Sequence, residues 1–120
     1  MTITIYHNPR CSKSRKTLEL LQQGQQQTQV IEYLKSPPDA TTVKQLINKL
    51  GITARDLLRS KEEEYKLAGL DDRNLSDDAL IAAMVKYPVL IERPIVVIGE
   101  KAILCRPPEK VLALMGHDDA

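Results

Sequence analysis

The sequence has no Phe and no Trp, and only four of its 120 residues are Tyr. Single-stranded nucleic acids bind largely by stacking on aromatic side chains, so this scarcity of rings argues against that class of partner. Charge of one sign is not in excess either, because 17 Lys and Arg stand against 16 Asp and Glu. Without a general electrostatic field we expect no nucleic acid and no membrane as partner, and any anion site has to be local.

Cysteine is also scarce. Cys11 and Cys105 lie far apart in the sequence, and two cysteines make neither a dense disulfide framework nor a four-ligand zinc site. The N-terminus shows no basic stretch followed by an apolar one, and no window approaches about 18 uninterrupted apolar residues. We therefore expect a cytoplasmic protein in a reducing compartment, without a metal site.

The length and the hydrophobic content of 42% suit one globular domain, which we expect to span residues 1–120. Residues 2–6 alternate as in a short strand, residues 12–23 have the pattern of a helix that Gly24 could cap, and residues 28–33 offer a second strand. This order predicts a βαβ unit with parallel strands.

The middle of the chain has helical patterns, and the end has a hairpin. Apolar spacings of three and four residues predict a helix that stops at Gly51, and Pro88 should end the last helix of this region. The other expected elements are helices at 55–59, 62–68 and from Ser76 to Tyr87, strands at 95–98 and 102–105, and a terminal helix with Val111, Leu112 and Met115. The order βαβ, helical insert, ββα predicts a mixed α/β fold of the thioredoxin-like type.

Cys11 falls between the first strand and the first helix, where free backbone N–H groups and the helix dipole favour an anion. The nearby His7, Arg10, Lys13 and Arg15 add positive charge, and such surroundings lower the pKa of a thiol and activate it. The alternative is a buried cysteine that packs as a small hydrophobe, which is unusual at a cationic turn. We favour a reactive Cys11.

The segment Cys11–Ser12–Lys13–Ser14 has the form CxxS, so the loop lacks a second thiol that could resolve a disulfide. A small thiol such as glutathione, or another redox protein, could resolve Cys11 instead. Cys105 is the one internal candidate, but it ends an apolar strand and is better explained by packing.

Three arginines, Arg59, Arg93 and Arg106, stand at junctions between predicted elements. Guanidinium groups make bidentate contacts with oxyanions, so several of them around one thiolate would bind a phosphate-sized substrate, although each alone could be an ordinary solvated side chain. Arg93 precedes Pro94, a position that is often cis in thioredoxin-like folds and faces the active thiol. His7 is either a charge partner of Cys11 or a polar residue hydrogen-bonded at the entrance of the loop.

Several segments together resemble the glutaredoxin-dependent arsenate reductase (ArsC) family, over nearly the whole chain. The length is that of the short chromosomal members, since the plasmid-encoded enzymes carry a longer C-terminal segment. The matching segments are residues 6–15 (YHNPRCSKSR), 57–59 (LLR), Tyr65 with 67–70 (LAGL), 87–88 (YP), 92–95 (ERPI) and 104–107 (LCRP).

The resemblance implies a thioredoxin-like enzyme without a bound cofactor, in which Cys11 attacks arsenate and Arg59, Arg93 and Arg106 bind the oxyanion. His7 matches the histidine thought to assist the cysteine, and Arg15 belongs to the anion-holding loop. Glutathione, as co-substrate, would then replace an oxygen of the Cys11 adduct, and glutaredoxin would reduce the mixed species and release arsenite.

Two other functions remain open. Transcriptional regulators of the Spx type share the fold and the Arg-Pro element and act by contacting RNA polymerase, although they often have CxxC where this chain has CxxS. A monothiol oxidoreductase that handles glutathione adducts would not need Arg59, Arg93 and Arg106. The three arginines and the HNPxC loop favour the reductase.

Overall fold

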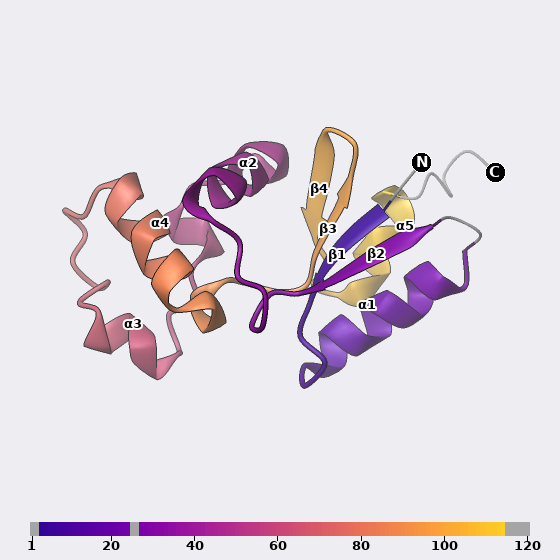
Figure 1. The fold of residues 1–120 in the computed structure, drawn as a ribbon, viewed down its shortest axis with the longest axis horizontal. Coiled ribbons are helices and arrows are strands. Elements are labelled where there is room, and N and C mark those ends of the chain that lie inside the picture. Colours follow the sequence, from indigo (N-terminus) through magenta and orange to yellow (C-terminus); the bar gives the residue numbers. More distant parts are fainter. Residues whose placement is uncertain (1–2, 25–26, 115–120) are drawn as a thin grey trace. The chain divides into compact units, whose positions relative to one another are not determined.

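The computed structural model describes residues 3–24 and 27–114, with side chains up to residue 112 (Figure 1). The described residues form two compact units. One consists of the chain up to Ser36 together with the chain from Arg93 onward, and the other is Pro37–Glu92. Within the described residues, no helix is long and apolar enough to cross a membrane.

The first unit is built on a four-stranded sheet with the order β2-β1-β3-β4. Its strands are β1 (Ile3–His7), β2 (Thr28–Glu32), β3 (Ile95–Ile98) and β4 (Lys101–Leu104). β1 pairs parallel with β2 and antiparallel with β3, and β3 and β4 form the antiparallel hairpin. This confirms the mixed α/β, thioredoxin-like fold predicted from the sequence.

Helices α1 (Ser12–Gln22) and α5 (Val111–Leu114) pack on this sheet and on each other, as Figure 1 shows. β1 alternates buried and partly buried residues, so Ile3 and Ile5 face the same core as Leu21 of α1. Val96, Cys105 and Val111 complete this core. Because His7 continues the buried face of β1, the strand carries a polar side chain from the core to the start of the loop before α1.

The second unit contains α2 (Ala40–Leu50), α3 (Glu63–Leu67) and α4 (Asp77–Lys86). The side chain of Asp39 accepts a 2.8 Å hydrogen bond from the N–H of Thr42 and begins α2, and Ser76 caps α4 in the same way. Gly51 ends α2 with a φ of 69°, which glycine adopts without the strain that a side chain would bring. Short 3₁₀ helices span Arg55–Leu57, Pro88–Leu90 and, in the first unit, Pro108–Lys110.

Two details of the sequence prediction were wrong. Gly24 is not the C-cap of α1: the helix ends at Gln22, and Gln23 stays right-handed. The N–H of Gln23 donates to the carbonyl of Glu19, and the N–H of Gly24 donates to the carbonyl of Leu21. The last turn tightens and leaves no left-handed position to fill. The predicted helix at 55–59 stops at Leu57, because Leu58 becomes extended and pairs with Ile91. Met115 lies outside the described residues.

Candidate functional site

Cys11 is the N-terminal capping residue of α1, with φ −94° and ψ 122°. The loop between β1 and α1 is closed by a 3.0 Å hydrogen bond from the N–H of Cys11 to the carbonyl of Asn8. The thiol therefore stands where the first N–H groups of the helix have no partner within the helix, and these groups favour a negative charge.

The surroundings of Cys11 favour the thiolate. Burial of the half-buried side chain raises the pKa of the thiol, but the backbone N–H of Ser14, the guanidinium of Arg93 and the N–H of Lys13 outweigh this effect and lower the pKa below its ordinary value. A thiol with a lowered pKa provides more of the nucleophilic thiolate at neutral pH. Cys11 therefore has the environment of a nucleophile.

Three polar side chains are buried beside the loop. The Nδ1 atom of His7 lies 2.6 Å from the Oγ atom of Ser14, and this oxygen also accepts a 3.0 Å hydrogen bond from the N–H of Asn8. His7 is 6% exposed, Asn8 5% and Ser14 0%, so water cannot replace these bonds. The contacts fix the loop and the first turn of α1, whose Ser14 N–H is directed to the Cys11 sulfur.

The protonation state of His7 bears on its two predicted roles. Burial lowers the pKa of His7, Glu32 opposes this with a smaller effect, and Arg15 contributes a still smaller lowering. A neutral imidazole at pH 7 supplies no positive charge to Cys11. The geometry favours the second role, that of a polar residue hydrogen-bonded at the entrance of the loop.

Arg15 and Arg93 both lie at this loop, in different ways. The Nη1 atom of Arg15 donates a 2.9 Å hydrogen bond to the carbonyl of Pro9, so this side chain holds the loop from outside. The guanidinium of Arg93 lies near enough to the sulfur of Cys11 to lower the pKa of the thiol. Arg93 precedes a cis peptide bond to Pro94, and Arg106, which follows β4 in the same unit, precedes another. The first unit thus contains Cys11 together with Arg15, Arg93 and Arg106.

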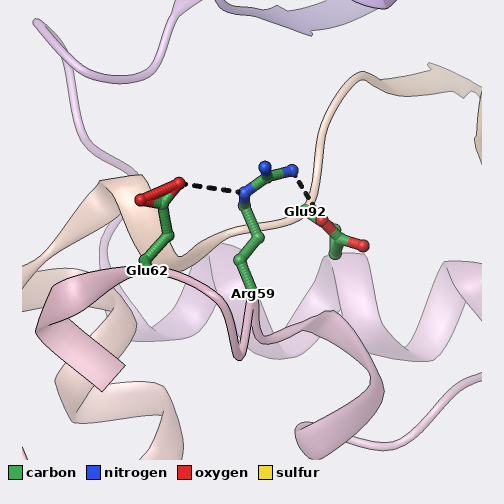
Figure 2. A network of polar contacts seen from close by, with 3 residues as sticks. All are labelled: Arg59, Glu62 and Glu92. Carbon is green, nitrogen blue, oxygen red and sulfur yellow. Dashed lines mark hydrogen bonds and ion pairs between the residues drawn. The ribbon is translucent and has the colours of Figure 1, made fainter. Parts of the chain in front are cut away.

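Arg59 belongs to the second unit, where two carboxylates hold it (Figure 2). Its Nη1 atom donates a 2.8 Å hydrogen bond to Glu92, and its Nε atom lies 3.4 Å from an oxygen of Glu62. No local sequence pattern indicates this arrangement, because Arg59 and Glu92 are 33 residues apart and meet only in the tertiary structure.

Other groups have structural roles. Cys105 is fully buried, and burial raises its pKa to about 12, so it remains a protonated core residue as the strand pattern suggested. Among residues 3–24 and 27–112, no three His, Cys, Asp or Glu side chains lie close enough together to hold a metal ion. Sequence reasoning missed the buried positions of Asn8 and Ser14, since polar residues in a loop are ordinarily solvated.

Comparison with known proteins identifies the family to which this chain is similar. The ArsC family model matches residues 6–114. The YfgD protein of Escherichia coli K12 is 52% identical over 115 residues, which cover 95% of this chain and 97% of that protein. An arsenate reductase of Neisseria meningitidis serogroup A is 46% identical over 94% of this chain and 97% of its own. Another, the arsenate reductase of E. coli K12, is 44% identical over 94% of this chain and 80% of its own.

The fold agrees with the sequence comparison. The structure of an arsenate reductase from Vibrio cholerae superimposes with a TM-score of 0.91 at 52% identity, covering 94% of this chain and 97% of that one. The family model spans the end of β1, the loop of Cys11, strands β2, β3 and β4, and the helical unit. The chain therefore belongs to the ArsC family.

Proposed function

We propose that this protein is an arsenate reductase that uses Cys11 as its nucleophile. The observation that carries the proposal is the position of Cys11 at the start of α1, where the N–H groups of Ser14 and Lys13 and the guanidinium of Arg93 stabilise the thiolate. The names of the relatives from N. meningitidis, E. coli and V. cholerae support arsenate as the substrate.

The first step joins sulfur to arsenic. The Cys11 thiolate attacks the arsenic atom of arsenate, an S–As bond forms, and one oxygen leaves as water after taking up protons. The leaving oxygen and the growing negative charge on the others need donors, which Arg93 can supply from its place beside the sulfur. Arsenic remains in its +5 state, so no reductant is consumed here.

The later steps need electrons from outside, because the one other thiol, Cys105, is buried in the core. We assign them to glutathione and glutaredoxin. The glutathione thiol displaces a second oxygen as water, and a glutaredoxin thiol then attacks the glutathione sulfur. This attack forms a mixed disulfide between glutathione and glutaredoxin. The two sulfur atoms are oxidised, and their two electrons reduce arsenic from the +5 to the +3 state. Water finally cleaves the S–As bond, which frees Cys11 and arsenite.

A hollow beside the loop suits the glutathione molecule. It measures about 280 Å³ and is lined by the three residues before Cys11 and by the chain after β2, namely Asn8, Pro9, Arg10, Glu32, Leu34 and Lys35. Glutathione carries two carboxylates and one ammonium group. Arg10 and Lys35 provide charges for the carboxylates, and Glu32 provides one for the ammonium group.

The assignment of the oxyanion ligands extends the proposal to both units. We propose that residues 1–120 act as one domain, in which Arg59 and Arg106 join Arg93 on the arsenate oxygens. For Arg59 this rests on the family resemblance alone. We assign His7 and Arg15 to the anion-holding loop, which they contact through Ser14 and Pro9.

The decisive experiment incubates the purified protein with arsenate, glutathione, glutaredoxin and a regenerating reductase, and measures arsenite. We expect arsenite production that Cys11→Ser abolishes and Arg93→Ala strongly reduces, while Cys105→Ala keeps it. Absence of arsenite from folded protein with a reactive Cys11 would reject the substrate, and arsenite from Cys11→Ser would reject the nucleophile. Omission of glutathione and of glutaredoxin, each alone, tests the two reductants.

A further inference from the structure

Tyr33 is a buried tyrosine that has no part in the chemical steps proposed for Cys11. It directly follows β2 in the first unit, and it is 1% exposed. Its hydroxyl oxygen is shielded from solvent, and so are the Nε and Nη1 atoms of Arg93. A buried phenol is stable only where its hydroxyl meets other polar groups, so the surroundings of Tyr33 indicate what it does.

The sheet brings Tyr33 and Arg93 to the same end of β1. β1 and β2 run parallel and are paired up to Glu32, so Tyr33 comes level with the first residue after β1. β1 and β3 run antiparallel, and Ile95 lies opposite the last residue but one of β1. Arg93, two residues before Ile95, therefore reaches the same level. Because β1 lies between β2 and β3, the two residues flank the loop that leads to Cys11.

The guanidinium of Arg93 lies near both the Tyr33 hydroxyl and the Cys11 sulfur. Burial alone would lower the pKa of Arg93, but the influence of Tyr33 and of Cys11 outweighs burial and raises it. In turn, burial raises the pKa of the Cys11 thiol, whereas two backbone N–H groups and Arg93 lower it. A guanidinium carries five N–H donors in a planar fork, so it can face a hydroxyl with one edge and a thiolate with another.

The flexibility of arginine makes such a neighbour useful. An arginine side chain has many rotamers, and a thiolate beside an unrestrained guanidinium would meet the positive charge for only part of the time. The ring of Tyr33 is enclosed in the interior and cannot move freely. Its hydroxyl is therefore a fixed point against which the guanidinium of Arg93 can rest.

We propose that Tyr33 is a positioning residue that keeps the guanidinium of Arg93 turned towards the Cys11 sulfur. The inference rests on the proposed function and deepens it, because it concerns the nucleophile of that reaction. Since Tyr33 is buried, it acts on the reaction only through Arg93. Without the hydroxyl, the thiolate loses part of its stabilisation, and less of Cys11 is in the reactive form at neutral pH.

The test is the pH dependence of Cys11 alkylation by iodoacetamide in the wild type, Tyr33→Phe, Arg93→Ala and the double variant. Tyr33→Phe removes the hydroxyl and keeps the ring. We expect it to raise the pH midpoint by about 0.4 to 1 unit, as the loss of one polar contact would do, and by no more than Arg93→Ala. The midpoint of the double variant should equal that of Arg93→Ala, because the hydroxyl has no effect without the guanidinium.

The matched control is Tyr65→Phe, which removes another hydroxyl that meets an arginine. The Nη1 atom of Arg55 donates a 3.0 Å hydrogen bond to the hydroxyl of Tyr65. Both residues belong to the second unit, whereas the residues that lower the pKa of Cys11 belong to the first. We therefore expect the midpoint of the wild type.

Three results would overturn the inference: an unchanged midpoint in Tyr33→Phe, an equal rise in Tyr65→Phe, or a double variant whose midpoint lies above that of Arg93→Ala. A measurement on the wild type covers the case in which Tyr33→Phe does not fold. A nuclear Overhauser effect between the ring of Tyr33 and the side chain of Arg93 should be present, and its absence would also overturn the inference.

The arsenite assay separates this inference from the proposed function. Arsenite from the wild type, together with equal midpoints in the wild type and Tyr33→Phe, leaves the reductase standing and removes the role of Tyr33. The expected midpoints without arsenite from the wild type have the reverse meaning. They support the action of Tyr33 on a reactive thiol and reject arsenate as its substrate.

Discussion

The Nδ1 atom of His7 and the Oγ atom of Ser14 lie 2.6 Å apart in the interior, at the point where β1 leads into the loop of Cys11. The Oγ atom of Ser14 also accepts a hydrogen bond from the N–H of Asn8, and the N–H of Ser14 is directed to the Cys11 sulfur. One buried hydroxyl therefore joins the end of the strand, the loop and the first turn of the helix. The contacts of Ser14 thus help to fix the loop that carries the thiol.

Ser14→Ala should destabilise the protein. It leaves the His7 imidazole and the Asn8 N–H buried without their partner, at a cost of about 1–3 kcal/mol in the free energy of unfolding. Urea denaturation followed by circular dichroism measures the change. Ser12→Ala alters an exposed serine of the same turn and should change the free energy by less than about 0.5 kcal/mol. A Ser14→Ala protein as stable as the wild type would show that Ser14 does not hold the loop.

The reactivity of Cys11 should depend on Arg93. Alkylation of Cys11 by iodoacetamide, read as the modified peptide by mass spectrometry, should have its pH midpoint below that of an ordinary thiol. Because the guanidinium stabilises the thiolate, Arg93→Ala should move the midpoint upward. Arg10→Ala removes an exposed cation that precedes Cys11 and should leave the midpoint near that of the wild type. Equal pH midpoints of alkylation in the wild type and in Arg93→Ala would refute the influence of Arg93 on the Cys11 thiol.

His7 should make the stability of the protein sensitive to acid. Since burial lowers its pKa in the folded state, the unfolded chain binds the proton more readily. The free energy of unfolding should then fall as the pH decreases below about 6.5, the pKa of an unperturbed histidine. In His7→Gln this part of the pH dependence should be reduced. Urea denaturation at several pH values from neutral to mildly acidic tests this, and an unchanged slope in His7→Gln would exclude the histidine as its source.

Replacement of two glycines by alanine should change the stability of the protein to different extents. Gly51 has a φ of 69°, where an L-residue is strained, so Gly51→Ala should cost about 1 kcal/mol although nothing lies within 4 Å of the added carbon. Gly24 has no positive φ, and Gly24→Ala should be neutral or slightly stabilising. Thermal unfolding of the two variants compares them directly. A larger loss for Gly24→Ala would contradict the described end of α1.

Much of the architecture could be predicted from local sequence. Alternating apolar residues mark β1, the spacing of Val43, Leu46 and Leu50 marks α2, and Gly51 marks its end, because these signals lie within a few residues of the structure that they specify. The ends of some elements differ from the predicted ends by one or two residues, because their backbone groups hydrogen-bond to other partners. Leu58 lies outside the helix that was predicted for it because it pairs with Ile91, which is distant in the sequence. No local pattern indicates this pairing.

For the site, the sequence by itself determined which chemical groups are present. It determined a cysteine between a strand and a helix, a CxxS segment without a resolving thiol, and arginines at the junctions. Only the tertiary structure decided what surrounds them: His7 shares a hydrogen bond with Ser14, Arg93 approaches the thiol, and Glu92 binds Arg59. Charge and hydrogen-bonding capacity are properties of single residues, whereas burial and partners depend on segments that meet only when the chain folds.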